Sequence, residues 1–171
     1  QLITDEWQLR KPIQDRFTFV DEDWDWIEHH PGNLQLDTVR TRARRVAEAG
    51  GEPFMLLGYA AFWASGAGYE ALSAGAFQRI HRHRGQAVNT FLIPKRLDDW
   101  DSYVCELMRG AGREVAGWVV WDSPDSTGPM AFPAEKFAPF LRAADHWRRA
   151  YCADKPLLIG GLARNTAVPY L

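Results

Sequence analysis

The chain has 171 residues, 46% of them hydrophobic and 25% charged, which is enough for one domain with a core. Its net charge of -2 argues against the strongly basic proteins that bind nucleic acid or an anionic membrane surface. No segment approaches the roughly 18 consecutive apolar residues of a membrane span. Eight tryptophans are the one unusual count, typical of a heavy core or of flat surfaces that stack on sugars or on partner proteins.

The cysteines and histidines are not spaced like the ligands of a metal ion. Cys105 and Cys152 fall on separate expected helices, which favours two buried thiols and leaves a disulfide as the alternative. His81 and His83 have no third ligand residue nearby. The sequence therefore predicts no metal and no cofactor. It leaves the compartment open, with a periplasmic or extracellular location slightly favoured over the cytoplasm.

The chain begins with a segment that has no clear period and then enters a regular alternation. Residues 1–15 are expected to form an amino-terminal arm. A strand is expected at 16–20, followed by an acidic and aromatic stretch at 21–28. Apolar residues recur along one face of a helix expected from 33 to about 49. Most of the acids in the stretch at 21–28 are expected to lie in a solvated turn.

The middle of the chain holds a second expected strand and then a long insertion. The continuous apolar run at 54–59 is typical of a strand covered on both faces in a parallel sheet. A glycine- and alanine-rich insertion follows at about 64–96, and we predict no element within it. The next helix is expected to begin at Leu97, with Asp98 or Asp99 as its N-cap.

The last third of the chain repeats the alternation of strand and helix. A strand is expected at 115–121, a helix from 133 to about 152, and a short strand at 156–162. Alternating strands and helices predict an α/β fold with a parallel sheet and right-handed crossovers. In such a fold, the residues that bind or react lie at the carboxyl ends of the strands.

The stretch at 117–125 is the clearest candidate for a site. A β-branched apolar run lies between Trp118 and Trp121 and stops at Asp122 and Ser123. The pattern predicts a buried strand that delivers polar side chains at its end, and a core strand before an ordinary turn is the alternative. Because side chains alternate along a strand, we expect the two tryptophans to face opposite sides, with Trp121 at the site.

Four segments, in order, resemble the clan A glycoside hydrolases, particularly the xylosidase- and iduronidase-like (β/α)8 barrels. Residues 19–32 resemble the second strand and its exit, 56–65 the third strand, 118–125 the fourth and 158–162 the fifth. The resemblance covers about residues 16–163. It implies that residues 16–171 form a partial or reduced TIM barrel, a parallel (β/α) barrel-type fold containing about strands two to five.

The same resemblance counts against catalysis. In that family an asparagine and the acid/base glutamate end the fourth strand, and here Asp122 and Ser123 stand at those two positions. A serine hydroxyl cannot protonate a glycosidic oxygen as a carboxylic acid does. The family's nucleophile comes from the seventh strand, which this chain does not reach. A complete barrel takes about 250 residues, so we expect other polypeptide to complete this one.

We therefore predict a non-catalytic, pseudoenzyme-like module that serves as a structural or binding subunit of a larger protein complex. Other chains, or the rest of a longer polypeptide, would complete it. The alternative is an active glycoside hydrolase with Asp122 or Asp125 as the acid and a nucleophile outside this chain. An α/β domain unrelated to sugars stays a third option. If an oligosaccharide binds, the residues expected to contact it are Trp24, Trp26, Tyr59, Trp63, Trp121, Asp122 and Ser123.

Overall fold

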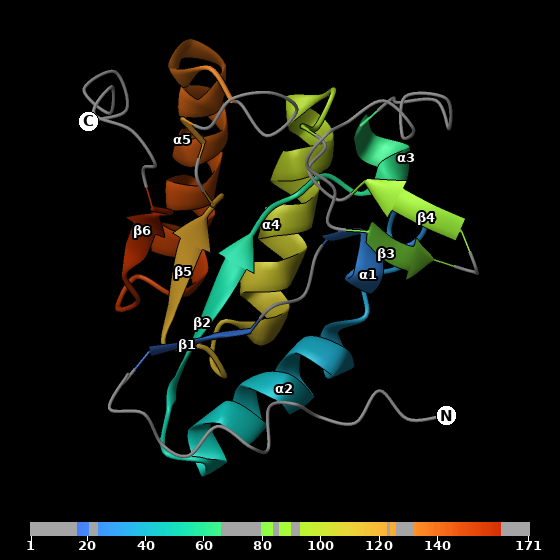
Figure 1. The fold of residues 1–171 in the computed structure, drawn as a ribbon. Coiled ribbons are helices and arrows are strands. Elements are labelled where there is room, and N and C mark those ends of the chain that lie inside the picture. The colour runs from blue at the N-terminus through green and yellow to red at the C-terminus, as the bar shows by residue number, and fades with distance from the viewer. Residues whose placement is uncertain are drawn as a thin grey trace.

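The structure is a computed structural model that describes residues 17–20, 24–65, 80–83, 86–89, 93–122, 124–125 and 132–161. Its centre is a four-stranded parallel sheet (Figure 1). In their order across the sheet, the strands are β1 (Phe17–Val20), β2 (Glu52–Leu57), β5 (Gly117–Val120) and β6 (Leu157–Ile159). The predicted α/β class with a parallel sheet is confirmed. The described residues form an open row of strands and do not close into a barrel.

The two central strands, β2 and β5, are largely buried, and their apolar side chains lie on both faces of the sheet. Met55 aligns with Trp118, and Leu57 aligns with Val120. These four side chains lie in the main apolar core, on the face that carries the helices. On the other face the pairing places Leu56 beside Val119, which is buried. Continuous apolar runs are therefore required here, as expected for a parallel sheet covered on both sides.

Three long helices pack beside the sheet and against one another. They are α2 (Leu36–Glu48), α4 (Leu97–Ala111) and α5 (Ala134–Tyr151). Helix α2 contacts β1, β2 and α4, while α4 packs along α5. Successive parallel neighbours joined by right-handed crossovers place their helices on the same face of a sheet. No helix in the described part of the chain is long and apolar enough to cross a bilayer.

Two short helices follow the first two strands of the sheet. Helix α1 (Trp24–Ile27) comes after β1, where the sequence predicts a solvated acidic turn, and α3 (Phe62–Ser65) comes after β2. Trp24 and Ile27 are fully buried, which explains why this acidic stretch is helical and packed. Within the insertion, Ile80–His83 (β3) and Gln86–Asn89 (β4) form an antiparallel hairpin that the sequence did not predict.

The start of α4 differs from the prediction. Arg96 occupies the N-cap position in an extended conformation and makes no side-chain capping bond, whereas Asp98 and Asp99 lie in the first turn. Acidic side chains in the first turn interact favourably with the positive end of the helix dipole. The same two residues therefore stabilise the helix end electrostatically, rather than as an N-cap.

Both Cys105 and Cys152 are free thiols. The expected arm at 1–15 lies outside the described residues.

Candidate functional site

The carboxyl ends of the four parallel strands lie at one end of the sheet. Hydrogen bonds join the segments that follow them. The Asp25 carboxylate accepts a bond from the backbone N–H of Phe62 at 2.8 Å. The Trp63 indole N–H donates to the backbone carbonyl of Glu28, also at 2.8 Å. The exits of β1 and β2 are therefore tied together by specific bonds before any ligand is considered.

Trp121 marks the exit of β5 with an unusual backbone conformation. Its φ is 61°, in the left-handed region that only a few per cent of non-glycine residues adopt. Glycines just beyond the ends of β2 and β6 make room for it. A Cβ on Gly58 would lie 3.2 Å from the Trp121 ring, and a Cβ on Gly160 would lie 1.7 Å from its carbonyl oxygen. Strain of this kind is held in place by the surrounding structure and often occurs near functional sites.

The expectation that Trp118 and Trp121 face opposite sides of the sheet is wrong. Both side chains are fully buried in one apolar core. The alternation rule assumed an extended backbone through Trp121, but β5 ends at Val120 and the left-handed residue that follows redirects the ring. The indole N–H of Trp121 has no hydrogen-bond partner among the described residues.

Three of the predicted sugar-contacting aromatics belong to a packed cluster. Trp24 stacks on Tyr103 with ring centres 4.3 Å apart and meets the edge of Trp63 at 5.6 Å. Tyr59 and Trp121 meet at 5.0 Å in an edge-to-face arrangement. Since Trp24, Tyr59 and Trp121 are buried, core packing accounts for their positions without a ligand. Edge-to-face pairs at these separations are favourable in themselves.

The remaining predicted aromatics lie closer to solvent. Trp26 is 43% exposed and lies edge-on to His29, with ring centres 6.2 Å apart. Trp63 is partly buried against the core. Of the five aromatic residues predicted to contact sugar, Trp26 therefore presents the most open surface. Its role in binding stays a prediction.

The two described acids after β5 differ in burial. Asp122 is exposed, while Asp125 is buried, with 8% of its surface exposed. Ser123 lies outside the described residues. The backbone N–H of Phe132 donates to the carbonyl of Pro124 at 2.8 Å, which holds this exit against the start of the next segment. Among the described residues of this exit, Asp125 is the buried carboxylate.

Glu28 is a buried carboxylate, whereas the sequence predicts a solvated turn for most acids of its stretch. It is 6% exposed, and its two oxygens accept bonds from the Trp24 indole N–H and from the backbone N–H of Gly32. Burial raises the pKa of Glu28, and the bonds from Trp24 and Gly32 partly oppose that rise. Trp24 and Glu28 are four residues apart, and this spacing of one helical turn is the feature of the sequence that could have predicted their contact. Because both oxygens are occupied, Glu28 is positioned to hold α1 against the following turn.

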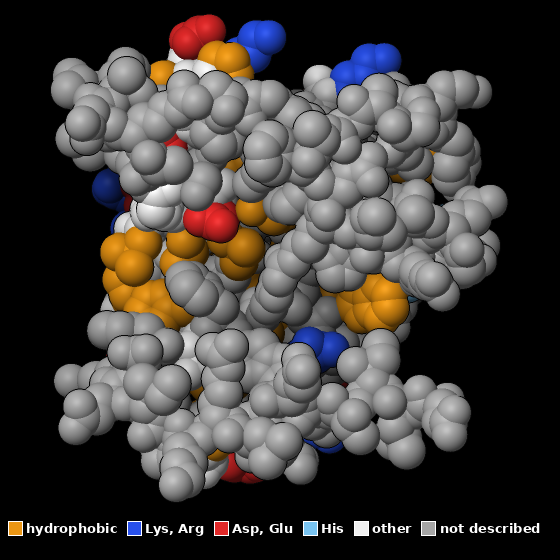
Figure 2. All heavy atoms as spheres, in the orientation of Figure 1, with side chains coloured by type: hydrophobic (Ala, Val, Ile, Leu, Met, Phe, Trp, Pro, Cys, Tyr) orange, Lys and Arg blue, Asp and Glu red, His pale blue; other side chains and the backbone are white. Residues whose placement is uncertain are grey.

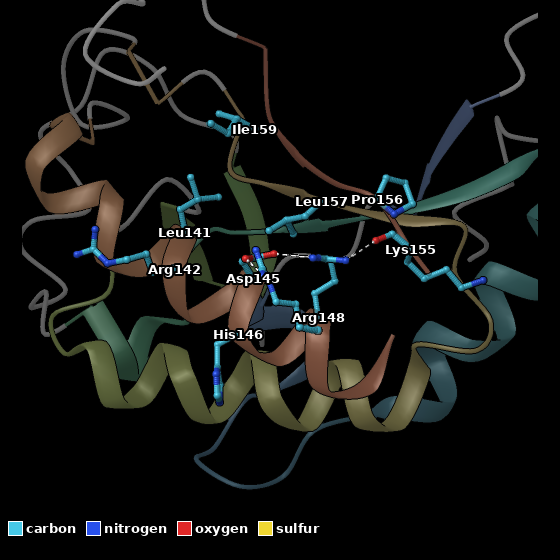
Figure 3. Close-up of a pocket in the computed structure, with 10 residues that line it drawn as sticks. Leu141, Arg142, Asp145, His146, Arg148, Lys155, Pro156, Leu157 and Ile159 are labelled. Carbon is cyan, nitrogen blue, oxygen red and sulfur yellow. Dashed lines mark hydrogen bonds and ion pairs between the residues drawn. The ribbon is translucent and has the colours of Figure 1, made fainter. Parts of the chain in front are cut away.

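A second concave feature lies away from the strand exits, between α5 and β6. It is an open groove of about 870 Å³ (Figure 3). Arg148 donates to the Asp145 carboxylate at 2.8 and 3.0 Å and to the backbone carbonyl of Lys155 at 3.3 Å. The bond from Arg148 holds the pKa of Asp145 below its ordinary value. No residue predicted from the sequence as a site lies in this groove.

Comparison with known proteins identifies no family for this chain. No protein-family model and no curated protein matches the sequence. Among solved structures, a β-glycosidase, BGL167, is similar to this chain at 12% identity with a TM-score of 0.49. The similar region covers 80% of this chain and 39% of the glycosidase.

Proposed function

We propose that this chain is a non-catalytic module of the (β/α) barrel type that acts as a structural or binding subunit of a larger assembly. The observation that carries the proposal is the strand order β1-β2-β5-β6, parallel throughout, with β1 and β6 at the two edges. Adding each strand beside the previous one is how a β/α barrel is wound. Sheet edges left open in this way are readily covered by other polypeptide.

Two further features support a role without catalysis. Ser123 stands where the resembled glycosidases have their acid/base glutamate. Trp24 and Trp121 are committed to the core and offer no open ring to a substrate. Trp26 is exposed, and an exposed aromatic ring of this kind can stack on a sugar and so form part of a carbohydrate-binding surface.

The test is a hydrolysis assay with a panel of aryl glycosides. We expect hydrolysis by the wild-type chain, by Asp122→Asn and by Asp125→Asn to stay at the background rate, because neither carboxylate performs chemistry. Carbohydrate binding is measured separately by calorimetry. If the wild-type chain binds a carbohydrate, Trp26→Ala should abolish that binding. Tyr151→Ala, which also truncates an exposed aromatic side chain, is the control and should leave the carbohydrate affinity unchanged.

Glycoside hydrolysis is the second candidate, favoured by the buried carboxylate of Asp125 just beyond β5. In glycoside hydrolases of this kind a carboxylic acid protonates the glycosidic oxygen, and Asp125 supplies a carboxyl group in the segment that follows β5. If this candidate is correct, the wild-type chain hydrolyses an aryl glycoside and Asp125→Asn abolishes turnover. That result would refute the non-catalytic proposal.

A further inference from the structure

The outer edge of β6 carries backbone groups that point away from the sheet. The carbonyl of Pro156 accepts a bond from β5 at 3.0 Å, and the N–H of Gly160 donates to β5 at 3.2 Å. Backbone direction alternates along a parallel strand, so the N–H and C=O groups of Leu157 and Ile159 point outward. In the part of the chain that the structure describes, β6 is the last strand of the sheet. Its edge can therefore pair with one more strand.

The side chains around this edge combine apolar surface with positive charge. Leu158 is 47% exposed on the face opposite the helices, and Figure 2 shows hydrophobic side chains gathered over β5 and β6. On the helix face lies the groove between α5 and β6, where Leu141, Asp145 and Arg148 lie between helix and strand, and Arg142 extends outward (Figure 3). An added strand would therefore contact Leu158 on one face of the sheet and the groove on the other.

The groove is basic although the chain as a whole is acidic. Among the described residues that line it, there is one carboxylate and there are four cationic side chains, which are Arg142, Arg148, Arg149 and Lys155. Lys155 also pairs with the neighbouring Asp154 at 3.6 Å. The carboxylate, Asp145, is already bonded to Arg148 at 2.8 Å and to Arg149 at 2.7 Å. Arg142 is exposed and has no ion pair with the described residues. The groove therefore complements negative charge, while the net charge of the chain is -2.

These features favour a polypeptide over other ligands. The described residues that line the groove include no Trp, Tyr or Phe side chain on which a sugar ring would stack. A second copy of this chain, related by a two-fold axis at this edge, would place one basic groove against the other, and like charges repel. Outward backbone groups beside aliphatic side chains are what an extended peptide uses when it joins a sheet.

We propose that the β6 edge and its groove bind an acidic, extended segment of a partner protein as an added strand of the sheet. This inference rests on the proposed role of the chain as a subunit of an assembly and specifies the chemistry of its partner. The added strand bonds to the backbone of Leu157 and Ile159. Its alternate side chains lie over Leu158 on one face and, as carboxylates, near Arg142 and its neighbours on the other.

The first test is titration with a fluorescent peptide of alternating valine and glutamate, followed by anisotropy. We expect saturable binding that weakens with salt, and no binding of the matched peptide with lysine in place of glutamate. Arg142→Glu should weaken binding about fivefold or more. Lys136→Glu makes the same charge change at an exposed position of α5 outside the groove and should leave binding unchanged.

The second test is amide hydrogen exchange of the complex, which distinguishes strand addition from a purely electrostatic contact. The amides of Leu157 and Ile159 should exchange more slowly with the peptide bound, while that of Leu158, directed toward β5, should not change. Absence of binding, equal binding of the lysine peptide, or binding without slower exchange at Leu157 and Ile159 would overturn the proposal. So would a dimer that Arg142→Glu dissociates in sedimentation experiments.

The two proposals fail in different experiments. Hydrolysis of aryl glycosides would overturn the non-catalytic function but would not change the result of the peptide titration. A chain that neither hydrolyses glycosides nor binds the acidic peptide would keep the proposed function and lose this partner site.

Discussion

Gly160 and Gly161 offer a sharp test of how β5 and β6 fit together, because adjacent glycines have opposite surroundings. A Cβ on Gly160 would lie 1.7 Å from the carbonyl oxygen of Trp121, whereas a Cβ on Gly161 would have no atom within 4 Å. Real Cβ contacts are essentially never shorter than 3.0 Å, so Gly160→Ala must move the two segments apart by about 1.3 Å. That movement also breaks the 3.2 Å bond from the Gly160 N–H to Val120.

Overpacking costs about 1–3 kcal/mol, and losing a backbone hydrogen bond costs about 1 kcal/mol more. We therefore expect Gly160→Ala to lower the free energy of unfolding by about 2–4 kcal/mol and Tm by about 5–15 °C. Gly161→Ala should raise stability by up to about 1 kcal/mol, through the lower entropy of its unfolded chain. Urea and thermal denaturation followed by circular dichroism measure both variants. Equal stabilities would refute the close approach of Gly160 to Trp121.

Three further predictions concern side chains that hold the ends of helices. Glu28→Ala should destabilise the fold by about 1–3 kcal/mol in urea denaturation, because the buried indole N–H of Trp24 and the part-buried N–H of Gly32 lose their acceptor. The exposed Glu48→Ala should change stability by less than about 0.5 kcal/mol. Because the fold raises the pKa of Glu28, it holds that proton more tightly than the unfolded chain does. Relative to Glu28→Gln, wild-type stability should fall as pH rises above 4.5 and then level off, and a constant difference would contradict the raised pKa. Arg148→Ala should cost about 1.5–3 kcal/mol by thermal denaturation, because this half-buried side chain bonds both Asp145 and backbone carbonyls. Arg149→Ala, which removes an exposed partner of the same carboxylate, should cost less than about 1 kcal/mol, and equal losses would count against the difference in burial.

The regular part of this fold follows from local patterns in the sequence. The continuous apolar runs that contain β2 and β5 predicted strands buried on both faces, and glycines after α2 predicted where that helix ends. Such patterns depend on periodicity within a few residues. For this reason the alternation of strands and helices, and hence the parallel sheet, could be predicted without knowledge of any long-range contact.

The candidate site was less predictable because it depends on contacts between segments far apart in the chain. The conformation of Trp121 becomes understandable only once Gly58 and Gly160 are known to flank it just beyond the ends of β2 and β6. Glu28 resembles the other acids of its stretch until the bond from Gly32 distinguishes it. The hairpin at β3 and β4 is rich in polar residues and lies outside the main sheet, so apolar alternation gave no signal for it.

The strand order also has a consequence for how the chain is assembled during synthesis. Because β1, β2, β5 and β6 join the sheet in the order in which they leave the ribosome, each strand meets a partner that has already been made. Every new unit can dock immediately, without waiting for a distant carboxy-terminal strand to insert between earlier ones. In a sheet of this strand order, each new strand can add beside the strand that was made just before it.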